Sequence, residues 1–148
     1  MIHSQRNSYH SLFSPTVTFA TNNTTVYYVD TQPTTGAQPN YCTILLGTEI
    51  NSSDGAFTSL KPVESDDTVQ SNFATFSGFV SGTDFTVPTP DGTNSSSVAF
   101  DIDLRGRKRY IGIVPVAANT TYNNISAFAI LGRYGEDPSS VADVHVKG

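Results

Sequence analysis

The feature that most constrains the fold is an alternation over residues 98–104, in which large apolar residues are separated by alanine or aspartate. Successive side chains of a β-strand point to opposite faces, so this two-residue period predicts a strand with one buried face. The apolar members are Val98, Phe100, Ile102 and Leu104, and Asp101 and Asp103 are among the residues between them. The basic residues 105–108 then predict a turn, and residues 109–116 predict a returning strand with Pro115 near its end.

Short segments of similar character occur along the whole chain, with turn-forming residues between them. They cover residues 16–20, 25–29, 41–46, 56–61, 125–131 and 141–146. Residues 41–46 are apolar on both faces, which predicts a central strand. No helix of convincing length and no internal repeat is evident. The expected fold class is therefore all-β, a β-sandwich or small barrel of roughly eight to ten short strands with long polar loops. We favour the sandwich.

Two segments leave the local structure open. Phe73, Phe76 and Phe79 follow a three-residue spacing that suits a helical face, but Gly78 makes a strand or an irregular segment equally compatible. Residues 64–67 are acidic and are expected to be exposed, with a single helical turn as one alternative.

The chain of 148 residues suits one domain. Residues 1–15 are polar and without periodicity, so we expect an extended N-terminal arm, followed by a single β-sandwich domain over residues 16–148. The low charged content of 14% and the abundance of Thr, Ser, Asn and Gly fit strands joined by polar turns.

Residue types that carry catalysis or bind metals do not form a recognisable motif. Cys42 lies in an apolar run and is expected to be a buried, inert thiol. Asp101 and Asp103 share one face of a strand, where a polar surface is favoured over an acid–base pair for glycoside hydrolysis. The histidines, at positions 3, 10 and 145, lack metal-ligand spacing. We expect no catalytic residue, no metal and no cofactor, and so a protein that is not an enzyme.

The charge balance narrows the choice of partners. A net charge of −5 and a pI near 4.9 argue against nucleic acid, which usually selects a basic surface. No apolar run approaches the ~20 residues that span a bilayer, so we expect no membrane association. The N-terminus does not resemble a signal peptide, which suggests a cytosol-like compartment. For the basic run 105–109, contact with another subunit or pairing with acidic residues of the same chain is favoured over nucleic acid.

Two stretches resemble a known family. The first runs from Ile44-Leu45-Leu46-Gly47 through Asp54-Gly55-Ala56-Phe57-Thr58 to Val63-Glu64-Ser65-Asp66-Asp67. The second is Asp103-Leu104-Arg105-Gly106-Arg107-Lys108-Arg109-Tyr110-Ile111, followed by Ala127-Phe128-Ala129-Ile130-Leu131-Gly132-Arg133. Together they cover about half the chain and resemble, in the same order, the small head proteins of tailed bacteriophages. The long N-terminal arm and the Thr/Pro-rich residues 86–97 depart from that pattern.

The resemblance implies a cement or decoration protein that binds and stabilises neighbouring major capsid subunits, often as a homo-trimer at local three-fold axes. It also implies a place in the virion capsid after assembly in the host cytoplasm. We expect the interface to use the arm and the basic run, and deletion of residues 1–15 to weaken capsid attachment while leaving the domain folded. The candidate interface residues are Arg6, Tyr9, Phe13, Arg105, Arg107, Lys108 and Arg109.

Three alternatives remain. A neck or tail protein of the virion would have the same all-β character. A carbohydrate-binding module displayed on the virion would use exposed tyrosines such as Tyr28 or Tyr122, although the chain lacks tryptophan, the best platform for stacking on sugars. A hydrolase that uses Asp101 or Asp103 is the least favoured alternative.

Overall fold

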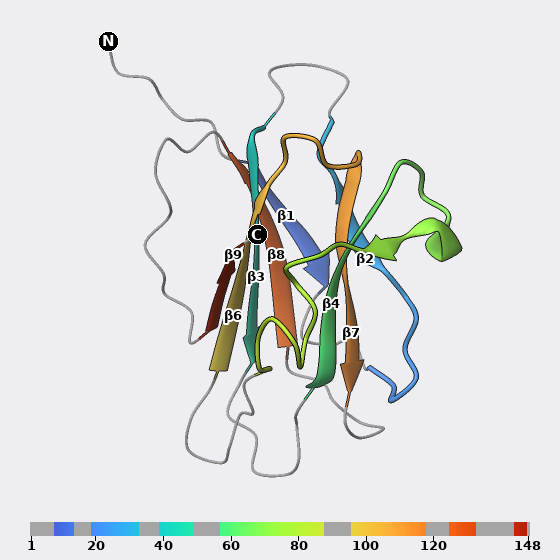
Figure 1. Ribbon diagram of the computed structural model, residues 1–148, viewed down its shortest axis with the longest axis vertical. Coiled ribbons are helices and arrows are strands. Elements are labelled where there is room, and N and C mark those ends of the chain that lie inside the picture. The colour runs from blue at the N-terminus through green and yellow to red at the C-terminus, as the bar shows by residue number, and fades with distance from the viewer. Residues whose placement is uncertain are drawn as a thin grey trace.

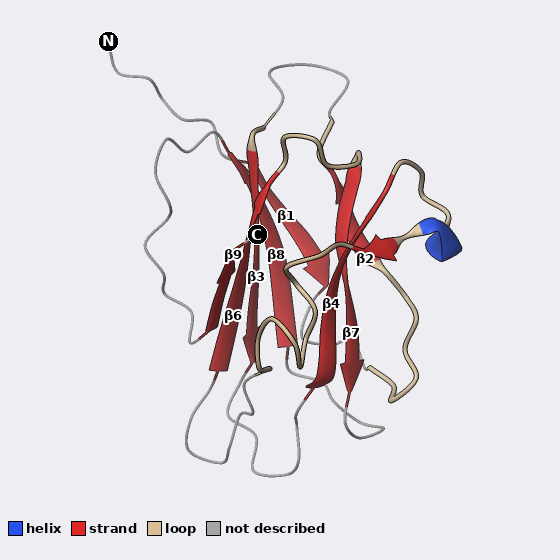
Figure 2. Cartoon of the chain, viewed as in Figure 1, coloured by secondary structure: helices blue, strands red, loops and turns tan. Residues whose placement is uncertain are grey.

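The protein is an open β-sandwich made of two sheets that pack face to face (Figure 1). The computed structural model describes residues 8–13, 19–32, 39–48, 57–87, 96–117, 125–132 and 144–147. Within these ranges the only helix is a single 3-10 turn, η1, at Gln70–Asn72 (Figure 2). The described strands do not close into a barrel, since each sheet ends in two separate edge strands. The predicted all-β sandwich is confirmed.

One sheet has five strands in the order β1-β8-β3-β6-β9. Its strands are β1 (Ser8–Phe13), β8 (Ile125–Gly132), β3 (Tyr41–Thr48), β6 (Ser96–Asp103) and β9 (Val144–Lys147). All neighbours are antiparallel except β6 and β9, which are parallel. Because β3 lies between β8 and β6, the prediction of a central strand over residues 41–46 is confirmed.

The other sheet has four strands in the order β2-β7-β4-β5. Its strands are β2 (Tyr27–Asp30), β7 (Tyr110–Ala117), β4 (Phe57–Ser65) and β5 (Ala74–Thr75). Pro115 of β7 pairs with β4 but lies beyond the four residues that pair with β2. At that position the strand has a ladder on one side only, which is where a proline is tolerated.

The core fills the space between the two sheets and follows the alternation read from the sequence. In β6 the side chains of Val98, Phe100 and Ile102 are buried, whereas Asp101 and Asp103 alternate with them on the outer face. In β2 the two consecutive tyrosines divide in the same way. Tyr27 packs against the core and Tyr28 points outward, 36% exposed. Alternation therefore predicted correctly which face of β6 is buried.

The phenylalanine-rich segment is irregular rather than helical. After η1 and the two-residue strand β5, the chain turns, and Phe76 and Phe79 insert into the core beside Phe100 of β6. Phe73 instead packs against Tyr28 on the outer face of the four-stranded sheet. The three phenylalanines thus lie in two places, two of them in the core and one on the outer face, and the helical interpretation of their spacing is wrong.

The N-terminal arm needs correction over residues 8–13. Ser8–Phe13 is strand β1, paired antiparallel with β8, and Phe13 is only 4% exposed. Its ring packs against Phe19 and Tyr27 at centroid distances of 4.9 and 5.1 Å. The strand was not predicted because its first residues are mostly polar and exposed, so they show no alternation of buried and exposed positions. Deletion of residues 1–15 would remove this strand and a core side chain, so the deletion no longer isolates attachment from folding.

Some predictions lie outside the described residues. They concern most of the strand at 16–20, the turn at Asp54-Gly55, the greater part of the loop at 86–97, and positions Arg6, His3 and Tyr122. The remaining strand predictions match described strands to within a few residues at each end.

The close approach of β2 to β7 leaves no room for a side chain at Gly112. A Cβ atom there would lie 2.6 Å from the Tyr27 carbonyl oxygen and 2.9 Å from both Tyr28 Cβ and Val26 Cγ1. We therefore expect Gly112→Ala to destabilise the fold by about 1–3 kcal/mol, as overpacking does. Urea denaturation measures this change. The control is Gly47→Ala in β3, where a Cβ meets nothing within 4 Å and the change should stay within about 0.5 kcal/mol. Equal stability of the two variants would contradict the close packing.

Candidate functional site

The basic run forms the turn that carries the chain from one sheet to the other. It connects the end of β6 to the start of β7 (Figure 1). The Arg107 amide donates a hydrogen bond to the Leu104 carbonyl at 3.1 Å, and Gly106 has a φ of +81°, a left-handed conformation that glycine adopts without strain. The predicted turn is confirmed.

Each basic side chain of this turn pairs with an acid of the same chain. Arg105 forms a two-point ion pair with Asp103, in which Nε lies 2.9 Å from Oδ1. Arg109 forms another with Asp30, in which Nη2 lies 2.6 Å from Oδ2 and Nε lies 3.0 Å from Oδ1. The guanidinium groups lower the pKa of both carboxyls, that of Asp103 to about 2.

The other two cations pair with acidic residues near the end of β4. Arg107 lies 3.7 Å from Glu64, and the Lys108 ammonium lies 3.9 Å from Asp66. The Lys108 backbone amide also donates to the Glu64 carboxylate at 3.1 Å. The acidic segment 64–67 therefore binds the basic turn, which sequence order alone does not reveal.

These pairs attach the crossover turn to the ends of β2, β4 and β6. The described residues thus show ion pairs between the basic run and acidic residues of the same chain, which is one of the two interpretations favoured from the sequence. Surface ion pairs of this kind contribute modestly to stability, and they already engage the cations that an external phosphate or capsid subunit would have to bind.

Three groups considered for chemistry have environments that suit a structural role. Cys42 is fully buried, and desolvation raises the pKa of its thiol to about 12, so the reactive thiolate does not form near neutral pH. Asp103 carries a lowered pKa, the opposite of the raised pKa that a glycosidase acid requires. Asp101 accepts a hydrogen bond from the Thr43 hydroxyl at 2.7 Å.

No cluster of His, Cys, Asp and Glu suited to a metal ion occurs in the described part of the chain. His10 lies exposed on β1, where its ring is within 3.1 Å of the Ser8 hydroxyl. Of the helical structure that can be described, none is long and apolar enough to cross a membrane.

The two remaining described interface candidates have opposite environments. Phe13 lies in the core and does not reach the surface. Tyr9 is 69% exposed on the outer face of the five-stranded sheet, in register with Ile130 of β8. Of the two arm candidates that the structure describes, Tyr9 is therefore the one that a partner can contact.

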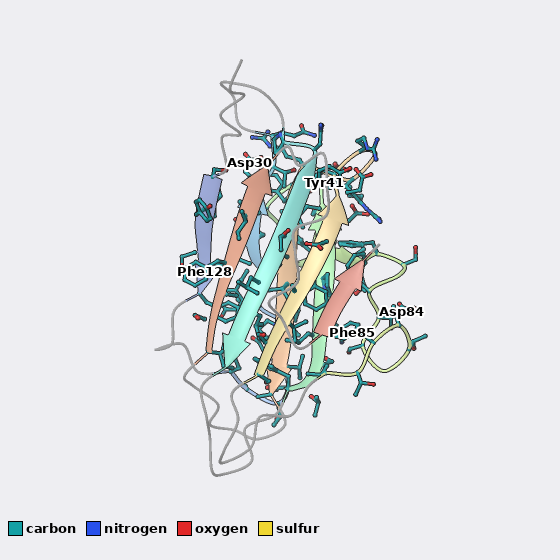
Figure 3. The ribbon with its side chains drawn as sticks, turned by 90° about the vertical axis from the view of Figure 1, so that its left-hand side faces the viewer. Asp30, Tyr41, Asp84, Phe85 and Phe128 are labelled. Atoms are coloured by element: carbon teal, nitrogen blue, oxygen red, sulfur yellow. The ribbon has the colours of Figure 1, made fainter. Side chains whose placement is uncertain are left out.

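Tyr9 belongs to an apolar surface that sequence analysis did not identify as a site. Phe128 of β8, 43% exposed, lies in register with Leu45 of β3 and beside Ile130 (Figure 3). We call Tyr9, Leu45, Phe128 and Ile130 the outer-face patch. The signal was the two-sided apolar character of residues 41–46 and 125–131, which predicted strands but was not read as an exposed surface.

A second aromatic group lies on the opposite outer face. The Tyr28 ring packs against Phe73 at 5.3 Å and against Tyr110 at 5.6 Å. The Arg109 guanidinium lies 5.1 Å from the centre of the Tyr110 ring and pairs with Asp30. This arrangement places aromatic rings next to groups that donate and accept hydrogen bonds.

Comparisons with protein-family models, with curated proteins and with solved structures find no match to this chain.

The ion pair between Arg105 and Asp103 leads to a prediction for the pKa of Asp103. In Arg105→Ala we expect the pKa of Asp103 to rise from about 2 toward its usual value near 3.8, because the hydrogen-bonded guanidinium is the main cause of the shift. The depressed pKa means that the pair stabilises the fold above pH 3.8 and that this contribution is lost as the pH falls through about 2. NMR titration of the Asp103 carboxyl carbon measures both values. Arg107→Ala, which removes only a distant charge, should shift the pKa much less. A pKa near 3.8 in the unmodified protein would show that the pair does not form.

Proposed function

We propose that this chain is a virion structural protein of a tailed bacteriophage, and specifically a capsid cement or decoration protein. Its partners would be neighbouring major capsid subunits, which it would bind and stabilise. The proposal is supported by the resemblance of two stretches to small phage head proteins and by a surface suited to protein contact. The observation that carries the second argument is the outer-face patch.

The outer face of an antiparallel sheet that meets water normally carries polar side chains. On the five-stranded sheet that face instead presents Phe128 of β8 and Tyr9 of the edge strand β1, with Leu45 and Ile130 half-buried beside them. Aromatic residues are enriched in protein interfaces, and contiguous exposed apolar surface marks interaction sites. The patch therefore supports binding to another protein rather than a solvated sheet surface.

The two outer faces of the sandwich differ in this respect. Val63 of β4 also points outward but is only 3% exposed. On this side of the sheet Phe73, from the segment between η1 and β5, packs against Tyr28. The Gln70 side chain fastens this segment by accepting a hydrogen bond from the Val26 amide at 2.6 Å. Val63 is thus buried on one outer face, whereas Phe128 stays 43% exposed on the other, and this contrast supports the five-stranded sheet as the face that meets the capsid.

Capsid occupancy of a Phe128→Ser variant tests the proposal. Purified protein is added to capsids that lack it, and bound protein is quantified after sedimentation. We expect the variant to bind about tenfold more weakly or worse, because loss of an aromatic contact at an interface centre typically costs more than 1 kcal/mol. Phe128 is exposed, so the isolated fold should be unaffected.

The matched control is Val69→Ser, since Val69 is 54% exposed beside η1, on the far side of the sandwich (Figure 1). It should bind as the unmodified protein does. Full occupancy of the Phe128 variant would reject the outer-face patch as the attachment surface. Failure of the unmodified protein to bind any capsid would reject the cement role, and binding at the neck or tail alone would favour the other virion assignment.

A carbohydrate-binding module is the second candidate, favoured by the aromatic group on the four-stranded sheet. Tyr28 is exposed and adjoins Tyr110, while Asp30 and Arg109 supply polar groups nearby. Sugar binding that persists in Phe128→Ser but is lost in Tyr28→Ala on a glycan array would support this function. If the unmodified protein binds no glycan on the array, the carbohydrate-binding function is rejected.

A further inference from the structure

Each sheet of the sandwich ends in edge strands whose outer backbone groups are open to another strand. Proteins usually guard such edges by keeping them short or by placing lysine or proline on them. Among the described strands β2 and β9 have four residues each and β5 has two. The part of β4 that extends past β5 carries Lys61, which is exposed, and Pro62. Three edges are therefore short, and the exposed length of β4 is guarded.

The edge strand β1 has neither protection. Its sequence, Ser-Tyr-His-Ser-Leu-Phe, contains no charged residue and no proline, and at six residues it is the longest of the four edge strands. Residues 8–11 are all exposed, so both faces of the sheet are open along this part of the edge. Pairing with β8 is regular from Ser8 to Ser11 and shifts before Phe13. An incoming strand would thus find an accessible, regular stretch of about four residues, roughly 14 Å long.

We infer that β1 pairs antiparallel with β1 of a second copy of this chain across a two-fold axis, joining the two five-stranded sheets into one. The backbone supplies the hydrogen bonds of such an edge-to-edge contact. The inference concerns how the protein associates with itself and stands whether or not its binding partner is a capsid.

A second copy can occupy this edge because β1 is able to pair with itself without bringing charged side chains together. The chain carries a net charge of −5, so two copies repel each other over most approaches. The uncharged strand β1 allows close contact without placing like charges opposite each other. A two-fold axis perpendicular to the sheet also keeps same-face residues opposite one another. Tyr9 then faces Tyr9 or Ser11 of the copy, and an aromatic cross-strand pair is a favourable one.

The same axis has a consequence for the outer-face patch. It leaves the outer faces of both copies on the same side of the continuous sheet, so that two patches lie next to each other across β1. A dimer of this form would present a doubled apolar surface to a partner, which strengthens attachment through multivalency. The ladder itself is short, so we expect a dimer that dissociates at micromolar concentrations.

Sedimentation equilibrium of the purified protein over a range of concentrations tests the inference. The unmodified chain should shift from monomer to dimer mass. Tyr9→Lys should remain monomeric where the unmodified chain is mostly dimeric, because lysines then meet across the axis and guard the edge. Tyr9 is 69% exposed, so the fold should persist, which far-UV circular dichroism checks. Val69→Lys, an equally charged change at an exposed position outside β1, should dimerise as the unmodified chain does.

Hydrogen exchange supplies an independent readout. Amides of residues 8–11 that point away from β8 should exchange more slowly in the dimer than in Tyr9→Lys. A monomer at every concentration, a trimer, or a dimer that Tyr9→Lys leaves intact would overturn the inference. These measurements use no capsid, so their failure leaves the capsid proposal standing, and a dimer that binds no capsid would separate the two in the other direction.

Discussion

Burial of aromatic side chains between the two sheets is the interaction on which the rest of the structure depends. On one side of the core, Phe13 of β1, Phe19, Tyr27 of β2 and Phe57 of β4 form a chain of edge-to-face contacts with centroid distances of 4.9–5.9 Å. A second group joins Phe76, Phe79 and Phe85 to Phe100 of β6. Because each group connects elements of both sheets or their loops, it fixes how the sheets face each other. Such pairs contribute about 0.5–1.5 kcal/mol each beyond the area they bury.

The aromatic residues buried between the sheets leave other side chains to form the two outer faces. With the inner faces filled, the segment around η1 is held against the outer side of the four-stranded sheet, where Tyr28 stays 36% exposed. The charged turn is fastened to strand ends by ion pairs within the chain. On the five-stranded sheet Phe128 stays 43% exposed. The surface available for contact is therefore apolar, and it lies next to β1, the edge strand without charge or proline.

The two-residue alternation in the sequence was enough to predict the fold class, because a period of two places every second residue in the core whatever the strand order. It located β6 and β7 on either side of the turn that the basic run predicted. It could not predict that β1 lies beside β8, or that residues 64–67 pair with the basic turn, since both depend on contacts between distant segments. It also misjudged Ser8–Phe13, where exposed polar residues give no alternation although the backbone is extended.

The candidate site was harder to predict than the fold. Of the candidate interface residues, Tyr9 is exposed, whereas Phe13 is buried and the cations of residues 105–109 are paired within the chain. Phe128 was hidden in a strand apolar on both faces, a pattern that does not say whether the second face meets another layer or the solvent. The arrangement of the two sheets is needed to show that the described residues leave Phe128 partly exposed.

The central claim is that the outer face of the five-stranded sheet is the surface by which this protein attaches to a larger assembly. Cryo-electron microscopy of the proposed phage particle tests this most directly. The account predicts density on the capsid shell, bridging neighbouring subunits, with Phe128 and Tyr9 turned toward the shell and buried there. Density on the shell with this face turned to solvent, or no density anywhere on the particle, would contradict it.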